Sequence, residues 1–209
     1  MNSNIYIKEI VENFICQLSK QALFIKHYDS EELNKADFIQ MVPAVTSAIC
    51  LYHEYQPKDM YEAYEPFLEW IRFLYNQHFK DIFTPEEFLK ECQVYSLHEE
   101  VFASYIRDGV CSRKEDVMYT EINFETTNIF TDFYHILRYV ASKQKLVFVL
   151  CSFHFAPKSS LQLLLHLLKK CVSNLYFIVV YNDTYYSNQP AQQASNSKSS
   201  HKIVLIILS

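Results

Sequence analysis

The chain of 209 residues contains a single glycine, Gly109. At an average usage of about 7%, a chain of this length would carry about 15 glycines. A loop that cradles the phosphates of a nucleotide needs two or three glycines within about eight residues, because its backbone must approach the phosphates closely. The glycine-flanked serine turn of hydrolases and the glycine-rich lid of protein kinases need several glycines as well. The count therefore excludes nucleotide chemistry by these usual routes.

The rest of the composition is that of a folded chain. Half of the residues are hydrophobic and 16% are aromatic, which is ample material for a core, so we do not expect disorder over most of the chain. The length allows one large domain or two small ones. The net charge of −5 argues against nucleic acid as a partner, because proteins that bind it usually carry a basic surplus.

Cysteine spacing and hydropathy bear on location. The six cysteines form no close pair such as CxxC, so we expect reduced core residues and neither a metal nor another cofactor. The longest apolar runs, near residues 146–151 and 203–208, are far shorter than the roughly 20 residues that span a bilayer. No basic-then-apolar leader opens the sequence. We therefore expect a cytoplasmic protein without a membrane partner.

Residues 1–142 have the pattern of a helical region. Apolar residues recur at spacings of three and four over residues 7–25, which predicts one long first helix. A second helix is expected to begin near Asp29 and to end or kink at Pro43. Pro66 suits the first turn of a third helix.

Several helix ends in this region carry explicit signals. Residues 84–87 combine a capping hydroxyl, a proline at the first helical position and a glutamate at the third, which predicts a helix start. Residues 96–99 and 112–115 repeat the capping-box spacing. Gly109 lies between these two, where a left-handed residue is expected to close one helix before the next begins.

After Lys145 the period changes. Residues 146–151 and 175–181 are short apolar runs rich in β-branched and aromatic side chains, typical of strands buried on both faces. Leucines at helical spacing separate the two runs. Residues 143–183 are therefore predicted to form a parallel βαβ unit. The predicted fold class is α/β, with a predominantly helical front and a small parallel sheet at the back.

The residue composition changes again over residues 184–209. Residues 184–201 are polar and predict a linker or loop. Residues 202–209 have the composition of a strand. Because the sequence stops within this apolar strand, we expect the chain to be a truncated fragment of a longer protein.

Three groups of side chains have both a functional and a structural interpretation. Three glutamates on one helical side either pair for acid–base work or form a wet surface stripe: Glu62, Glu65 and Glu69. Four tyrosines either stack bases or fill a seam between helices: Tyr52, Tyr55, Tyr61 and Tyr64. Residues 98–100 either hold a metal or cap a helix in solvent, where acids complement the helix dipole. We favour the structural interpretation of all three.

Polar side chains gather after the two predicted strands of the βαβ unit. Cys151, Ser152 and His154 follow the first strand, whereas Asn182 and Asp183 follow the second. Open α/β sheets bind their ligands at the carboxyl ends of the strands. These five residues are therefore the candidate vestigial pocket. Cys151 and His154 also offer a nucleophilic pair, although the sequence supplies no acid close by to orient the histidine.

Residues 147–161 resemble the Walker B segment of STAND-type signalling ATPases, a branch of the AAA-like P-loop proteins. In that family, four apolar residues are followed by two acids, an apolar residue, histidine, an aromatic residue, alanine, another acid, and a serine–leucine pair that opens the next helix. Five residues match this pattern: His154, Phe155, Ala156, Ser160 and Leu161. Three others stand where acids are expected: Cys151, Ser152 and Pro157. Residues 64–71 are similar to the segment that follows the Walker A helix in this family, but the Walker A loop itself is absent.

The resemblance implies a degenerate NTPase-like module. Without the acids and a lysine-bearing loop, ATP hydrolysis should be lost. Bacterial signalling proteins with tetratricopeptide repeats and diguanylate cyclase domains have similar amino-terminal regions. We therefore expect a non-catalytic regulatory or protein-interaction domain, whose partners are other proteins or missing downstream domains of its own chain. The alternatives are a nucleotide- or small-ligand-binding module without hydrolysis and, third, a cysteine-dependent enzyme that uses Cys151.

Overall fold

The computed structural model describes most of the chain. The described residues are 9, 11–14, 16, 22–26, 39, 47–61, 63, 64, 66–109, 122–181 and 204–208. The chain forms two compact units. The first comprises residues 1–60, 145–156 and 176–209, and the second comprises residues 61–144 and 157–175.

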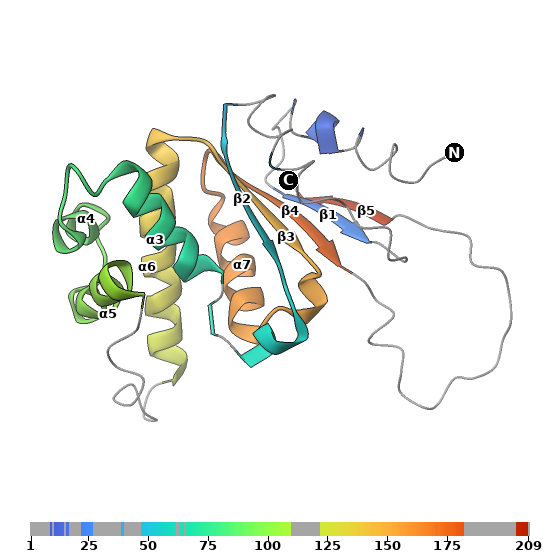
Figure 1. The fold of residues 1–209 in the computed structure, drawn as a ribbon. Coiled ribbons are helices and arrows are strands. Elements are labelled where there is room, and N and C mark those ends of the chain that lie inside the picture. Colours follow the sequence, from blue (N-terminus) through green and yellow to red (C-terminus); the bar gives the residue numbers. More distant parts are fainter. Residues whose placement is uncertain are drawn as a thin grey trace, which may run out of the picture. The chain divides into compact units, whose positions relative to one another are not determined.

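The first unit contains a five-stranded sheet in the order β2-β3-β4-β1-β5 (Figure 1). Its strands are β1 (Ala22–Lys26), β2 (Ile49–Glu54), β3 (Leu146–Cys151), β4 (Leu175–Tyr181) and β5 (Val204–Leu208). Four of them form a parallel sheet, and β5 pairs antiparallel with β1. In register, Ala22 of β1 lies opposite Phe177 of β4. The α/β class is thus confirmed, with a sheet larger than the sequence predicted.

The middle of the sheet is apolar on both faces. Every residue of β3 is buried, as expected for a continuous apolar strand in a parallel sheet. On one face, side chains of β1 to β4 pack with Val11 and Phe14 from the first residues of the chain. On the other, the rings of Phe148 and Phe177 meet edge to face at 5.3 Å. Burial on both faces is what confines residues 146–151 and 175–181 to strands, as predicted.

Two strands lie where the sequence predicted only helices. Residues 11–14 are helical, but β1 follows at Ala22–Lys26, so the prediction of one helix over residues 7–25 is wrong. The run from Ala22 to Ile25 is too short for periodicity to separate a buried strand from a helical turn. It becomes a strand because β4 and β5 flank it. The prediction of a helical region is wrong at β2 for the same reason, since β2 pairs with the distant β3.

Other predicted segments have different outcomes. The terminal strand expected at 202–209 is confirmed as β5. The helix predicted between Asp29 and Pro43 lies outside the described residues except Ile39, which is helical. The capping signal at residues 112–115 and the linker at 184–201 also lie outside them.

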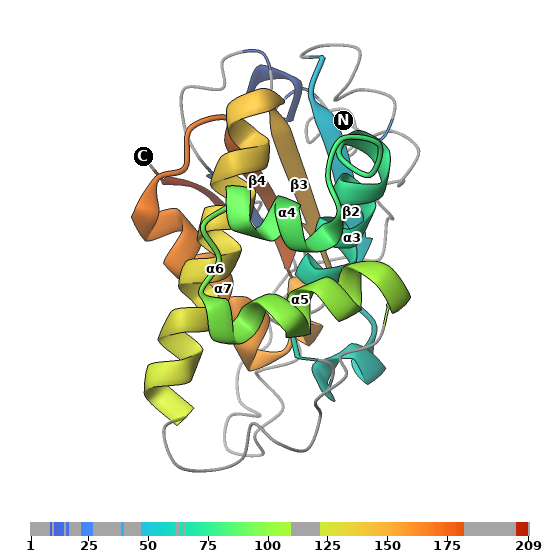
Figure 2. The same ribbon diagram turned by 90° about the vertical axis from the view of Figure 1, so that its left-hand side faces the viewer.

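The second unit is helical. It contains α3 (Phe67–His78), α4 (Pro85–Glu91), α5 (Ser96–Asp108), α6 (Ile122–Lys143) and α7 (Lys158–Lys170) (Figure 2). Two short 3-10 helices are η1 (Pro57–Tyr61), at the boundary between the units, and η2 (Phe153–Phe155), in the first unit. The apolar periodicity places one face of each long helix inward, as in Phe133, Ile136 and Leu137 of α6.

Two aromatic clusters hold α3 to α6 together. Phe133 of α6 meets the rings of Phe67 at 6.4 Å and Phe102 at 5.3 Å, which joins α3 and α5 to α6. Phe88 of α4 lies 5.4 Å from the ring of Tyr75 and 6.0 Å from that of Tyr139, which joins α3 and α6 to α4. Because edge-to-face pairs add specific geometry to buried area, these rings fix how the helices pack.

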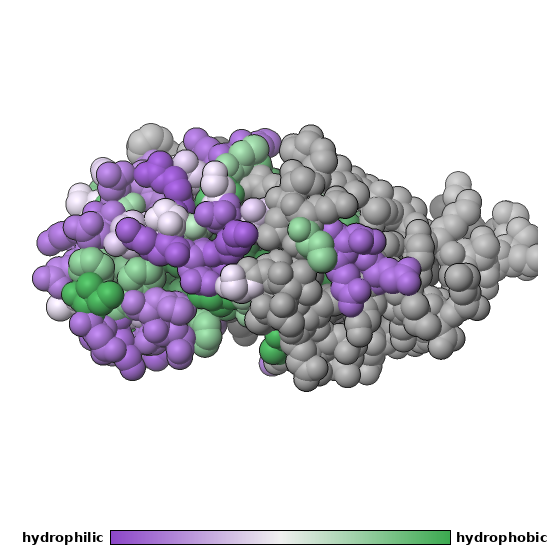
Figure 3. All heavy atoms as spheres, turned by 90° about the horizontal axis from the view of Figure 1, so that it is seen from above, coloured by the Kyte–Doolittle hydropathy of each residue, from purple (hydrophilic) through white to green (hydrophobic). Residues whose placement is uncertain are grey.

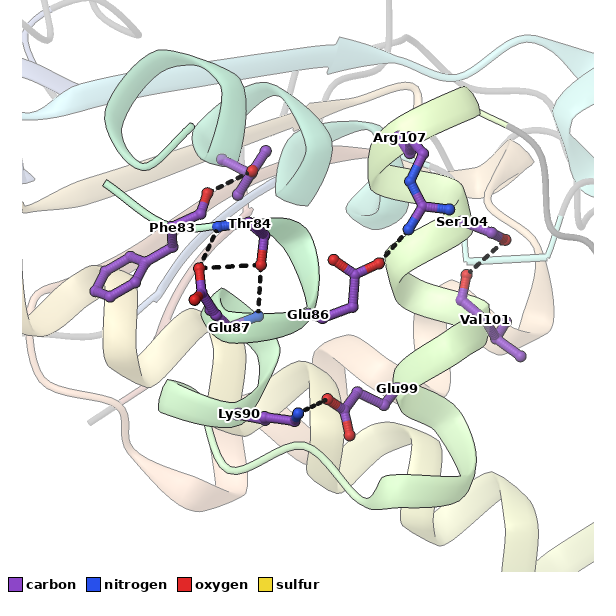
Figure 4. Close-up of polar contacts among 10 residues, drawn as sticks. Phe83, Thr84, Glu86, Glu87, Lys90, Glu99, Val101, Ser104 and Arg107 are labelled. Carbon is purple, nitrogen blue, oxygen red and sulfur yellow. Dashed lines mark hydrogen bonds and ion pairs between the residues drawn. The ribbon is translucent and has the colours of Figure 1, made fainter. Parts of the chain in front are cut away.

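The start of α4 forms the predicted capping box (Figure 4). The backbone N–H of Glu87 donates to Oγ1 of Thr84 at 3.2 Å. The N–H of Thr84 donates in return to Oε2 of Glu87 at 2.8 Å. These two bonds satisfy donors that the first turn of a helix leaves without intrahelical partners.

Gly109 ends α5, as predicted, in the left-handed conformation with φ of 73°. Its N–H donates to the carbonyl of Tyr105 at 2.8 Å. Arg72 of α3 adds a second reason for glycine, because its Nε donates to the carbonyl of Ile106 at 3.3 Å. A Cβ on Gly109 would lie 2.7 Å from Nη1 of Arg72. The single glycine therefore gives the chain a left-handed turn and leaves space for a guanidinium at the negative end of a helix dipole.

The capping box predicted at residues 96–99 is wrong. The N-cap of α5 is Tyr95, which makes no side-chain cap bond. Its N–H donates instead to Oδ1 of Asp132 on α6 at 2.8 Å. A carboxylate distant in sequence therefore accepts from the N-cap N–H, which is the role of the local glutamate in a capping box.

We predict that Gly109→Ala lowers the free energy of unfolding by about 1–2 kcal/mol, the cost of a left-handed L-residue. The midpoint of thermal unfolding should fall by roughly 2–4 °C for each kcal/mol. Gly109→Asn should lose less, since asparagine tolerates this conformation better. An unchanged midpoint for Gly109→Ala in thermal unfolding followed by circular dichroism would contradict the assignment.

We predict that Thr84→Ala destabilises the protein by about 1 kcal/mol, whereas Thr84→Ser, which keeps the hydroxyl, has little effect.

The backbone and side-chain hydrogen bonds from Thr84 lower the pKa of Glu87. The contribution of Glu87 is therefore present above its ordinary pKa of 4.5 and is lost as the pH falls through the lowered value. Denaturant unfolding between pH 3 and pH 7 should show a shallower acid-induced loss for Glu87→Gln. If the free energy of unfolding falls with pH equally in Glu87→Gln and in the parent, the capping box is not a source of the pH dependence.

Candidate functional site at the carboxyl ends of the parallel strands

The ends of β2 and β3 bring polar groups together at one edge of the sheet. Glu54 lies opposite Cys151 in the register of the two strands. The N–H of Tyr55 donates to the carbonyl of Cys151 at 3.1 Å. Ser152 then takes the left-handed conformation with φ of 51° and turns the chain into η2. Non-glycine residues adopt this conformation only where the surrounding structure enforces it, and such residues cluster at functional sites.

Cys151 is a buried thiol with only 6% of its surface exposed. Burial raises its pKa from the ordinary value of 9.0 to about 12, and the nearby carboxyl group of Glu54 acts in the same direction. Burial also raises the pKa of Tyr52, whose hydroxyl donates to Oε2 of Glu54 at 3.4 Å. Both groups are therefore protonated and neutral at pH 7. Cys151 offers neither a thiolate nucleophile nor the charge of a carboxylate.

Aromatic and polar contacts connect the segments that follow the two strands. The carboxylate of Asp59 accepts from the N–H of Gln56 at 2.7 Å and lies 3.7 Å from Nε2 of His53. The ring of Tyr55 meets the edges of His53 at 4.5 Å and Phe153 at 5.5 Å. These contacts fix the loop after β2 against the loop after β3.

His154 lies within this group of loops on η2. Its ring is 4.0 Å from that of Phe155, and desolvation lowers its pKa. A lowered pKa keeps the imidazole neutral at pH 7, so it is able to donate or accept a hydrogen bond but does not attract anions by charge.

Three of the five predicted site residues lie within the described part of the chain. Cys151, Ser152 and His154 are consecutive or nearly so at the end of β3. Asn182 and Asp183 lie outside the described residues, although β4 ends at Tyr181 immediately before them. Across the described ranges, no three histidine, cysteine or acidic side chains gather as metal ligands would.

Sequence reasoning missed the contribution of β2 to this site. Tyr52 and Glu54 reach Cys151 only because β2 pairs with β3 in the observed register. The signal available was the short apolar stretch at residues 49–52, which ends in the polar pair His53-Glu54. This stretch is too short to separate a strand from a helix within a region whose apolar periodicity is helical.

A second polar cluster lies in the helical unit. Nδ1 of His98 is 2.5 Å from Oδ2 of Asp132, whose other oxygen accepts from Tyr95. Asp132 is only 2% exposed, so the pair is a buried connection between α5 and α6. The prediction of a solvated cap is therefore wrong for His98. Glu99 instead forms an ion pair with Lys90 at 3.8 Å.

Among the tyrosine and glutamate groups, Tyr55, Tyr64 and Glu69 follow the structural interpretation, whereas Tyr52 belongs to the candidate site. Tyr55 is 1% exposed. The ring of Tyr64 lies 5.5 Å from that of Phe133, so it fills a seam beside α6. Glu69 is exposed and accepts from the hydroxyl of Tyr105 at 2.7 Å. Glu62 and Glu65 lie outside the described residues.

The cysteines are free thiols wherever the structure describes them. Cys92 and Cys151 are buried, Cys50 is partly buried, and Cys16 and Cys171 are exposed. The prediction of core cysteines is therefore confirmed for the buried residues and wrong for the two exposed ones.

Comparison with known proteins identifies no relatives: no family model, curated protein or solved structure matches the chain. Within the described part of the chain, no helix has both the length and the apolar composition needed to cross a bilayer.

We predict that iodoacetamide at pH 7.5 alkylates the exposed Cys171 much faster than Cys151. A pKa of about 12 in place of 9.0 leaves about a thousandfold less thiolate on Cys151, and burial slows access further. Peptide mapping by mass spectrometry over a time course measures both rates in one sample. Equal rates would show a reactive Cys151 and restore the hypothesis of a cysteine-dependent enzyme.

Proposed function

We propose that this chain is a non-catalytic regulatory or protein-interaction domain of a cytoplasmic signalling protein, built on a degenerate NTPase-like scaffold. The observation that carries the proposal is the buried, protonated Cys151 at the end of β3. In STAND-type ATPases, which residues 147–161 resemble, this strand ends in acids.

Hydrolysis of a nucleotide needs negative charge at the end of this strand. Mg²⁺ requires hard oxygen ligands and usually at least one carboxylate. Phosphoryl transfer depends on that metal and on a group that positions the attacking water. A thiol whose pKa is about 12 and the hydroxyl of Ser152 supply neither negative charge nor basicity at pH 7. The end of β3 therefore favours a retained scaffold over a working hydrolase.

The topology of the sheet supports the same proposal from a second direction. Open α/β sheets bind ligands at the carboxyl edge, where successive connections leave in opposite directions. From β1 the chain continues to β2 at one edge of the sheet, and from β4 it continues to β5 on the far side of β1. The switch point therefore lies between β1 and β4. A phosphate-binding loop would be expected to follow β1, but residues 27–46 contain no glycine.

The alternative function is a nucleotide- or small-ligand-binding module that does not hydrolyse its ligand. It is favoured by the polar groups at the carboxyl edge, since Tyr52, Glu54 and His154 lie where such folds place their ligands. The two functions make opposite predictions about ligand binding.

We predict that ATP, GTP and cyclic dinucleotides with Mg²⁺ leave the thermal unfolding midpoint unchanged. A ligand at a hundred times its dissociation constant would stabilise the folded state by about 2.7 kcal/mol, a shift of roughly 5–10 °C for a chain of this size. Phosphate release from ATP should equal that of a buffer blank.

Saturable stabilisation that disappears in His154→Ala would overturn the interaction-domain proposal in favour of the ligand-binding module. Phosphate release above the blank would overturn both functions. Asp108→Ala, a change on α5 in the other unit, serves as the matched control for general effects on stability.

A further inference from the structure

Helix α7 has two apolar faces, of which only one is covered. Leu163, Leu164 and Leu167 are fully buried. Leu161 and Leu165, one turn apart on another side of the helix, are 43% and 46% exposed. A helix on the surface of a protein usually needs one apolar stripe, with polar residues opposite. The second stripe therefore needs its own explanation.

Lysines flank this exposed stripe. At 100° per residue, Lys158 and Lys169 project beside Leu161 and Leu165, and all four side chains are exposed. We call these four residues the basic face. Helix α7 carries no acidic residue, and neither does the whole of residues 145–181. None of the ion pairs in the described part of the chain uses a lysine of α7.

Acidic residues are in excess around α4 and α5, in contrast to the lysines of α7. Residues 81–108 contain seven acidic residues and two cations other than histidine. Both cations are engaged within the segment, Lys90 with Glu99 and Arg107 with Glu86 (Figure 4). A surplus of negative charge therefore remains on the surface, and the charge of the chain is divided between separate helices.

Large apolar side chains are exposed within this acidic segment as well. Ile82 is 67% exposed and Leu97 is 71% exposed. Leu97 shares one side of α5 with the exposed Glu100, three residues later. Glu91 ends α4, and the ion pair of Lys90 with Glu99 holds that end of α4 beside the start of α5. We call Glu91, Leu97 and Glu100 the acidic face. Figure 3 shows hydrophobic patches in green interrupting the purple, hydrophilic surface of the helical unit. Exposed apolar residues rimmed by charge are typical of protein interaction sites.

We propose that the basic face of α7 binds the acidic face of α4 and α5 on a second copy of this chain. Both faces combine exposed aliphatic side chains with charge of one sign, and the signs are opposite. Complementary charge steers the two surfaces together and disfavours like pairs, while Leu161, Leu165 and Leu97 lose their contact with water.

The two faces belong to different parts of the helical unit. Helix α7 packs against α6, whereas α4 and α5 pack against each other and α5 packs against α3. Because the faces do not share a surface, binding is head to tail, and each bound copy leaves one face of each kind open. Such an interface extends into a ring or filament. This inference rests on the proposed role as an interaction domain and names its partner.

The test uses the full chain in sedimentation velocity at low salt. Variant A carries Leu161→Ser and Leu165→Ser, and variant B carries Leu97→Ser. We expect the parent to self-associate with increasing concentration and each variant alone to associate at least about tenfold more weakly. An equimolar mixture of A and B should form a one-to-one dimer that grows no further, because only one intact pair of faces remains.

The matched control is Phe73→Ser on α3, which alters a side chain that is 45% exposed and lies outside both faces. It should associate like the parent.

A second experiment exchanges the charges of the two faces and so identifies the partner surfaces. Lys158→Glu with Lys169→Glu should weaken association, and mixing with Glu91→Lys plus Glu100→Lys should restore it.

Three results would overturn the proposal: a monomeric parent at every concentration, association of variant A or B equal to that of the parent, or no dimer in the A and B mixture. Circular dichroism of each variant verifies that it is folded. A monomeric parent leaves the proposed interaction function standing with a different partner. Phosphate release or saturable nucleotide binding by the same samples bears only on the proposed function.

Discussion

The parallel pairing of β1 with β4 is the constraint on which the sheet depends. It places Ala22 opposite Phe177, so that segments near the two ends of the chain become neighbours. Parallel pairs of this kind pay a large loop-closure entropy before their contacts form. They persist here because the strands bury apolar side chains on both faces. The same pairing aligns the carboxyl ends of β1, β3 and β4, which creates an edge suited to a ligand.

That edge is built from three backbone features: a buried strand, a left-handed turn at Ser152 and a short helix that carries His154. The side chains of Cys151 and His154 are neutral at pH 7 because burial raises the pKa of Cys151 and lowers that of His154. A neutral thiol at the end of β3 accords with the proposed role as a scaffold that presents other surfaces. The helical unit offers those surfaces, where charge of each sign is concentrated on different helices.

Prediction from the sequence succeeded where the signal was local. The capping box at Thr84 and the helix end at Gly109 depend on residues within one turn, and both occur as expected. The strands β3 and β4 were recognisable because every residue in a doubly buried strand is apolar. Prediction failed at β1, at β2 and at the start of α5. There, strand pairing and the buried Asp132 override local propensity, and neither leaves a periodic signal in the segment itself.

The sequence by itself determined the exclusions. One glycine rules out a glycine-rich phosphate loop anywhere in the chain, whatever the fold, because no other residue lets the backbone approach phosphates so closely. Only the tertiary structure decided the second reason for that glycine, since Arg72 reaches it from another helix. It also decided the state of Cys151, because a pKa depends on burial and on Tyr52 and Glu54 brought near by β2. The composition determines which titratable side chains the chain contains, and packing determines their charge at pH 7.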